Sequence, residues 1–170
     1  MSLPEEQVIS GEAKKAAVSW TGGKDCNLAL LKAWRNPAYR VTCLVVFCPP
    51  DARFRAHPLP LMRAQARLLS LPLRTIEFSL DAAKDYKKAY VNGIQNLKEE
   101  HGIEVIVTGD MDLVGSMQRN WIEECTESVP GVGVYLPLWK ADRGTILNEL
   151  VEYGFHVVFT CVKTPYFDAS

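Results

Sequence analysis

Short apolar runs alternate along the chain with segments that have a helical period. The runs typical of buried strands are Ala16–Trp20, Val41–Phe47, Leu73–Phe78, Glu104–Asp110, Gly133–Trp139 and His156–Val162. Helices are predicted between them, over Asp25–Arg35, Leu61–Leu69, Asp81 to about His101, Ser116–Cys125, and Arg143–Tyr153 with Asp142 as N-cap. Because parallel strands need right-handed helical crossovers, this alternation predicts a three-layer, Rossmann-like α/β fold with a mostly parallel sheet of five to six strands.

The topology also predicts where a ligand binds. In folds of this class, ligands lie beyond the carboxyl ends of the strands. The segment Thr21–Asp25, the chain after Phe47, and Gly109-Asp110 are therefore expected along one rim of the sheet.

The composition fits one domain in a reducing compartment. The chain has 170 residues, of which 48% are hydrophobic and 23% charged, so a single core is expected, with residues 1–15 as a flexible lead-in and 16–170 as the domain. No apolar run approaches the roughly 20 residues of a membrane helix, and no signal-peptide core is present. The five cysteines lack zinc-type spacing. We expect a cytoplasmic protein without membrane association.

The charge distribution gives no strong nucleic-acid signature. Nineteen Lys and Arg against 20 Asp and Glu leave a formal net charge of −1, so no broad basic surface is available for nonspecific binding. The local basic bias consists of Arg53, Arg55, Arg63, Arg67 and Arg74. Such a group contacts phosphate or RNA in some proteins, and more often forms a solvated face.

The segment Ser19–Cys26 carries the strongest chemical signal. It places Gly22-Gly23 and Lys24 between a predicted strand and a helix N-terminus, where free amides and a positive charge favour an anion. A Walker A loop is excluded because Val18 stands at its first glycine and Asp25 replaces the Ser or Thr after the lysine. We therefore expect a phosphate-binding loop of another kind.

Asp25 indicates how the phosphate would be held. A carboxylate beside phosphates is repulsive unless a divalent cation bridges them, so Asp25 implies Mg²⁺. The alternative is that the glycine pair only forms a tight turn and Asp25 only stabilises the helix N-terminus.

The loop and several later segments resemble a known family. Thr21–Cys26 resembles the SGGKDS loop of the ATP pyrophosphatases (PP-loop, adenine nucleotide alpha hydrolase superfamily), with Thr and Cys at the two serine positions. RAHPLPLMRAQARLLSLPL, VTGD, QRNWIEECTE, YLPLW and FHVVFTCV are similar, in order and spacing, to the ATP-binding domain of diphthine-ammonia ligase and its prokaryotic relatives. The resemblance covers about residues 16–163 and implies a HUP-type domain.

The resemblance implies a ligase reaction. Such an enzyme adenylates a carboxylate with ATP and Mg²⁺, releases pyrophosphate, and lets ammonia displace AMP to leave an amide. Its partners would be ATP, ammonia and diphthine-bearing elongation factor 2, and a homo-oligomer is compatible with it. The family continues into a Gly-Glu-Gly-Gly-Glu-type motif, whereas this sequence ends at KTPYFDAS. Either the chain is truncated or its acceptor differs, so ATP binding is better supported than amidation.

The resemblance also implies site residues. The nucleotide-binding set comprises Ser19, Thr21, Gly22, Gly23, Lys24, Asp25, Cys26, Val46, Phe47, His57 and Gly109, with Asp25 as the metal ligand and Lys24, Asp110 and Arg119 as the catalytic group. The glycines and Lys24 would hold phosphates, and backbone groups near Val46-Phe47 would face adenine.

Several of these residues have a plainer interpretation. Gly109-Asp110 is either a site for metal, ammonia or acceptor, or a strand-ending turn. Arg119 either meets the α phosphate or acyl group, or is a surface arginine. His57 is more often a structural residue than a ligand contact, and Trp139 would either line the acceptor pocket or close the core.

Two other functions stay open. The first is an RNA-modifying PP-loop ATPase, against which stand the missing CxxC pairs and the missing basic appended domain. The second is a nonenzymatic adenine-nucleotide-binding module. Release of AMP separates this module from both enzymes.

Overall fold

The computed structural model describes residues 6–7, 9–50, 52–54, 56–78, 86–160 and 162. The elements in chain order are β1 (Lys14–Ser19), α1 (Lys24–Arg35), β2 (Tyr39–Cys48), α2 (Leu59–Leu68), β3 (Leu73–Glu77), α3 (Tyr86–His101), β4 (Val105–Val107), α4 (Trp121–Thr126), β5 (Gly133–Tyr135) and α5 (Arg143–Glu152). All strand pairs are parallel, and the strand order is β3-β2-β1-β4-β5. The predicted α/β, mostly parallel sheet is confirmed, with five strands in the described residues.

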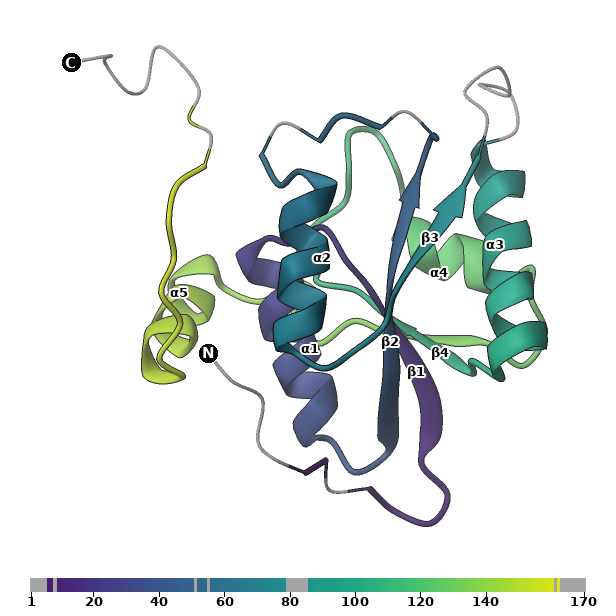
Figure 1. Ribbon diagram of the computed structural model, residues 1–170, viewed down its shortest axis with the longest axis horizontal. Coiled ribbons are helices and arrows are strands. Elements are labelled where there is room, and N and C mark those ends of the chain that lie inside the picture. The colour runs from purple at the N-terminus through teal and green to yellow at the C-terminus, as the bar shows by residue number, and fades with distance from the viewer. Residues whose placement is uncertain are drawn as a thin grey trace.

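The sheet lies between two layers of helices (Figure 1). Helices α1, α2 and α5 pack on one face, and α3 and α4 pack on the other. The central strand β1 serves both layers because its side chains alternate: Ala16 and Val18 join the first core, whereas Ala17 joins the second. A strand that is buried on both faces reads as a continuous apolar run, which is how it is recognised in the sequence.

The strand order creates a switch point beside β1. The chain builds outward from β1 through β2 to β3, then crosses over to β4 on the other side of β1. Val18 of β1 pairs with Val107 of β4, and Ser19 pairs with Val45 of β2. The loops after these three strands therefore share one rim, at the place where such folds bind ligands.

The strand predicted over His156–Val162 is wrong. Its described residues form no strand, and Val158 and Phe159 are 78% and 83% exposed. The β-branched composition of this run reports a local preference for extended backbone. A strand also needs a neighbour, and the described part of this run pairs with none of the five strands.

Several element boundaries differ from the predictions. The helix predicted from Ser116 begins only at Trp121, because Asn120 caps α4 by accepting hydrogen bonds from the amides of Ile122 and Glu123 at 2.9 and 3.1 Å. The strands predicted over Glu104–Asp110 and Gly133–Trp139 contract to three residues each, and β1 begins two residues before its predicted start.

The helix ends carry capping signals that local sequence encodes. Helix α3 ends at His101 as predicted, followed by Gly102 at φ +66°. Asp142 caps α5 as predicted, with its Oδ1 accepting from the Thr145 amide at 2.8 Å. The predicted start of α3 at Asp81 lies outside the described residues. Among the helices of the described residues, none is long and apolar enough to cross a membrane.

Candidate phosphate-loop site

The predicted phosphate loop lies between β1 and α1, and its shape depends on Gly22. This residue has a φ of +78°, a left-handed conformation that side chains rarely adopt. A Cβ at Gly22 would also lie 3.0 Å from Gln65 Oε1 and 3.2 Å from His57 Cβ. Gly23 then precedes α1 in extended backbone, without a side-chain cap on the helix. The amides of the first turn of α1 are therefore left for another acceptor.

The two charges of the loop face each other. Lys24 Nζ lies 2.5 Å from Asp25 Oδ1, and the side chains are 34% and 35% exposed. Without ligand each charge neutralises the other. A phosphate would compete for the ammonium, and a cation would compete for the carboxylate.

Gly109 brings the end of β4 against the start of α1. A Cβ on Gly109 would lie 2.5 Å from the carbonyl carbon of Asp25 and 2.7 Å from the amide nitrogen of Cys26. Such distances leave no room for any side chain, so the Gly109-Asp110 turn packs directly on the phosphate loop. The structure thus brings together two predicted parts of the site that lie far apart in sequence.

Asp110 is held by a residue that the sequence predictions missed. Asn120 Nδ2 donates to Asp110 Oδ2 at 2.7 Å, while Asn120 Oδ1 caps α4. Asn120 is 3% exposed, so both ends of its amide are used in a buried position. Asparagine before a helix is a known N-cap signal, and it was obscured here by the helix predicted from Ser116.

A cavity of about 250 Å³ opens beside the loop. Its lining includes Ser19, Thr21, Val46, Phe47 and His57, all of which belong to the predicted nucleotide-binding set. The Phe47 ring, which lines it, stacks on Tyr90 with centroids 4.2 Å apart. An apolar, aromatic wall next to polar loop groups suits a flat heterocyclic base joined to phosphates.

A second cavity, of about 420 Å³, lies on the other flank of the loop. It is lined by Gly22, Gly23, Lys24, Asn27, His57, Leu61, Gln65, Leu68, Leu69, Phe155, His156, Val157, Val158 and Thr160. Because His57 lines both cavities, it stands at the border between them.

Cys26 stands where the SGGKDS loop of the ATP pyrophosphatases has its second serine, and its thiol is buried. Its Sγ donates to the Gly23 carbonyl at 3.1 Å and accepts from Thr21 Oγ1 at 3.7 Å. Burial raises the pKa of this thiol, and hydrogen bonding from Thr21 and from the backbone of Gly22 and Gly23 opposes the shift without cancelling it. The sulfur therefore stays protonated at neutral pH and serves the loop as a hydrogen-bonding group.

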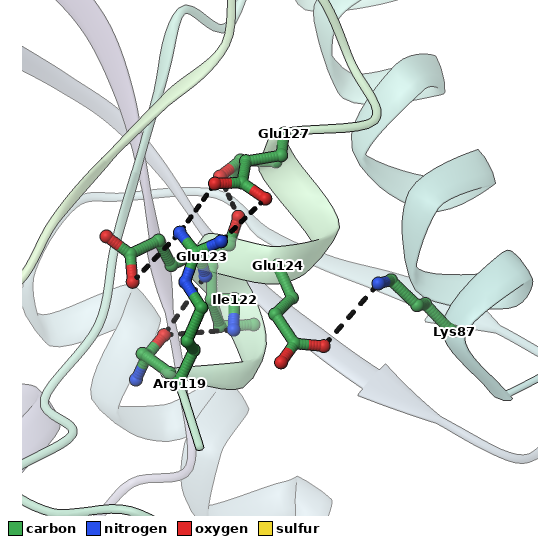
Figure 2. A network of polar contacts seen from close by, with 8 residues as sticks. Lys87, Arg119, Ile122, Glu123, Glu124 and Glu127 are labelled. Atoms are coloured by element: carbon green, nitrogen blue, oxygen red, sulfur yellow. Dashed lines mark hydrogen bonds and ion pairs between the residues drawn. The ribbon is translucent and has the colours of Figure 1, made fainter. Parts of the chain in front are cut away.

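Arg119 lies among carboxylates at the start of α4 (Figure 2). Its guanidinium donates to both carboxylate oxygens of Glu127, at 2.9 and 2.5 Å, and lies 3.5 Å from Glu123. The hydrogen bond raises the pKa of Arg119 and holds the pKa of Glu127 below its usual range. The structure thus engages Arg119 with α4, and its contact with the α phosphate or acyl group stays a prediction.

The other basic and aromatic candidates lie apart from these contacts. Arg53, Arg63 and Arg67 are exposed, and Arg55 lies outside the described residues. Lys140 Nζ stands 5.0 Å from the centre of the Trp139 ring. The described ranges contain no group of three or more His, Cys, Asp or Glu residues placed to hold a metal ion. The role of Asp25 as a metal ligand stays a prediction.

The chain is similar to known proteins in sequence and in fold. Residues 14–133 match the family model described as the diphthamide synthase N-terminal domain. No curated protein matches the chain significantly. A predicted subunit of tRNA methyltransferase from Methanocaldococcus jannaschii has a similar structure, with 16% identity, a TM-score of 0.55, and coverage of 81% of this chain and 76% of that one.

Two longer structures share the fold. A 4-thiouridine synthetase in complex with RNA and bound ATP aligns with 18% identity and a TM-score of 0.57, over 83% of this chain and 41% of its own. A protein from Pyrococcus horikoshii aligns with 16% identity and a TM-score of 0.52, over 83% and 42%. The chain spans less than half the length of both, and at these identities the likeness shows the fold alone.

Proposed function

The chain belongs to the diphthamide synthase N-terminal domain family of PP-loop, ATP-using enzymes, and on this premise we propose that it is an amide-forming ligase. It would adenylate a carboxylate with ATP and then let ammonia displace AMP. The observation that carries the proposal is the junction of three loops at the switch point. Gly109 packs against Asp25, and the cavity at Val46 and Phe47 opens beside the same loop.

Different residues on the rim would bind the base and the phosphates. The base would occupy the cavity lined by Val46, Phe47 and Tyr90. The phosphates would accept hydrogen bonds from the amides of the loop and contact the ammonium of Lys24. Pyrophosphate is the leaving group, so a positive charge held at this end of the nucleotide stabilises the developing charge. When bound, Mg²⁺ neutralises phosphate charge, and Asp25 is the carboxylate that would hold it.

The proposed reaction has two steps. In the first, a carboxylate oxygen bonds to the α phosphorus, and the bond from that phosphorus to the bridging oxygen of pyrophosphate breaks. In the second, the ammonia nitrogen bonds to the acyl carbon, and the bond from that carbon to AMP breaks. Asp110, which Asn120 holds by a hydrogen bond, would orient ammonia and accept the proton that its nitrogen loses.

Because the family is that of the diphthamide synthase N-terminal domain, we propose diphthine on elongation factor 2 as the acceptor. The chain would be incubated with ATP labelled in its adenosine part, Mg²⁺, ammonium and diphthine-bearing elongation factor 2, and nucleotides separated by chromatography. We expect AMP with pyrophosphate, and loss of both in the Lys24→Ala variant. ADP and phosphate as sole products would overturn the assignment.

Two further outcomes identify the alternatives. If AMP forms only when transfer RNA is added, the protein is an RNA-modifying PP-loop ATPase. If ATP binds but no AMP forms with either acceptor, the chain is a nonenzymatic nucleotide-binding module.

A further inference from the structure

The carbonyl groups of the glycine pair are tied to side chains of two helices. Gln65 Nε2, from α2, donates to the Gly22 carbonyl at 3.0 Å, and Asn27 Nδ2, from α1, lies 3.5 Å from the same oxygen. The Gly23 carbonyl accepts from Asn27 Nδ2 at 2.8 Å, from the Asn27 amide at 3.2 Å and from Cys26 Sγ at 3.1 Å. The Gly23 carbonyl thus accepts from three donors, whereas the Gly22 carbonyl depends mainly on Gln65.

Trp20 determines which way the Gln65 amide points. Its indole Nε1 donates to Gln65 Oε1 at 3.2 Å, and an indole nitrogen is only a donor. The oxygen of Gln65 must therefore face Trp20, which leaves the NH₂ group for the Gly22 carbonyl. Trp20 is 1% exposed at the end of β1, so this orientation is fixed from the core of the fold.

Because a peptide group is planar, fixing the Gly22 carbonyl also fixes the direction of the Gly23 N–H. In a trans peptide the C=O and the following N–H point in opposite directions, so holding the Gly22 carbonyl toward Gln65 aims the Gly23 amide at the other side of the loop. The Thr21 hydroxyl donates to Cys26 Sγ in the same loop, and α1 begins after Gly23 without a side-chain cap. Successive backbone N–H groups at such a turn form a nest for an anion.

We propose that Gln65 is a positioning residue for the phosphate loop, which it serves by holding the Gly22–Gly23 peptide in the orientation that receives phosphate; this rests on the proposed function. The loop needs such a partner because two adjacent glycines leave this peptide free to rotate. A rotated peptide would present a carbonyl oxygen to the phosphates in place of an N–H.

The test compares two Gln→Met substitutions of equal chemistry. Gln65→Met keeps the length and helix propensity of the side chain and removes its hydrogen bonds with Trp20 and with the Gly22 carbonyl. Gln95→Met, in α3, removes a hydrogen bond to Glu99 and touches neither cavity. Dissociation constants for Mg-ATP and for adenosine would be measured by calorimetry on the full chain.

The expected result is a loss specific to phosphate. Gln65→Met should bind Mg-ATP about tenfold more weakly, the value of one well-made hydrogen bond, while adenosine binding stays unchanged. Gln95→Met should bind both ligands as the unsubstituted chain does. Asn27→Leu should cost less than Gln65→Met, because the Gly23 carbonyl keeps two other donors.

A second measurement is independent of nucleotide binding. In the ligand-free chain, Gln65→Met should shift the NMR amide signal of Gly23 and speed its hydrogen exchange, with the signals of α3 unchanged. Unaltered Gly23 signals in a folded Gln65→Met variant would overturn the positioning role. Equal weakening of ATP and adenosine would also overturn it, because Gln65 would then only shape the cavity. If the unsubstituted chain binds no ATP while the Gly23 signal responds, the proposed function fails and the clamp on the peptide stands.

Discussion

Substituting Gly109 by alanine tests the junction of β4 with the phosphate loop. An added Cβ would lie 2.5 Å from the carbonyl carbon of Asp25 and 2.6 Å from its oxygen, whereas ordinary contact begins near 3.4 Å. The neighbouring atoms are backbone and cannot turn aside, so the end of β4 and the start of α1 must separate by about 1 Å.

This displacement has two measurable costs. Overpacking of this kind destabilises a folded domain by about 1–3 kcal/mol. Because the displaced loop would lose at least one hydrogen bond to the phosphates, we expect Mg-ATP affinity to fall about tenfold or more. The loss of Mg-ATP affinity should persist at temperatures where the variant is fully folded, because the displaced loop is a feature of its folded state.

Gly133→Ala is the matched control. A Cβ at Gly133 meets nothing within 4 Å, and this residue lies in the edge strand β5. Urea unfolding and calorimetry with Mg-ATP would be run on both variants. Normal stability and normal ATP affinity in Gly109→Ala would refute the inference that this glycine seats β4 against the loop.

Three further predictions concern charged residues. Lys24→Ala should weaken Mg-ATP binding strongly in calorimetry with little change in unfolding temperature, because the side chain is partly exposed and its partner is the adjacent Asp25; unchanged affinity would remove the loop from the site. Asp25→Asn should lower the Mg²⁺ dependence of ATP binding more than binding in chelator, whereas tighter binding at every Mg²⁺ concentration would mean that the carboxylate only repels phosphate. Hydrogen bonds from the Thr145 amide and hydroxyl hold the pKa of Asp142 below its usual range, so the cap stabilises the protein above about pH 4 and is lost as pH falls through that lowered pKa. The difference in unfolding temperature between Asp142→Ala and the unsubstituted chain should accordingly be full at neutral pH and shrink in acid, and a difference that is constant with pH would contradict the assignment.

Local signals in the sequence were sufficient for the loop and for most elements. Gly22-Gly23 and Lys24 stand next to an apolar strand and a helical period, and every part of that pattern is read within a few residues. The contact of Gly109 with Asp25 is different, because it depends on how β4 pairs with β1. A pairing between distant segments leaves no local trace, so the sequence could place both residues on one rim without predicting that they touch.

Gln65 was missed because its contacts also join segments that are distant in the sequence. Gln65 looks like any polar position of an amphipathic helix, and its function appears only when α2 packs beside Trp20 and Gly22. The predicted strand at His156–Val162 failed in the opposite direction. Its apolar pattern is strong, and in the described residues no neighbouring strand meets it.

The pairing of Lys24 with Asp25 links the two ligands of the proposed reaction. Without ligand the ammonium and the carboxylate neutralise each other at 2.5 Å, so ATP alone would engage Lys24 and leave Asp25 unpaired beside phosphate. Mg²⁺ alone would leave the ammonium unpaired beside a dication. Only the two together satisfy both charges, and a coupling of this kind is reciprocal: each ligand must raise the affinity for the other by the same factor. In the proposed reaction the loop would therefore select the Mg-ATP complex over free ATP through a pair of adjacent residues.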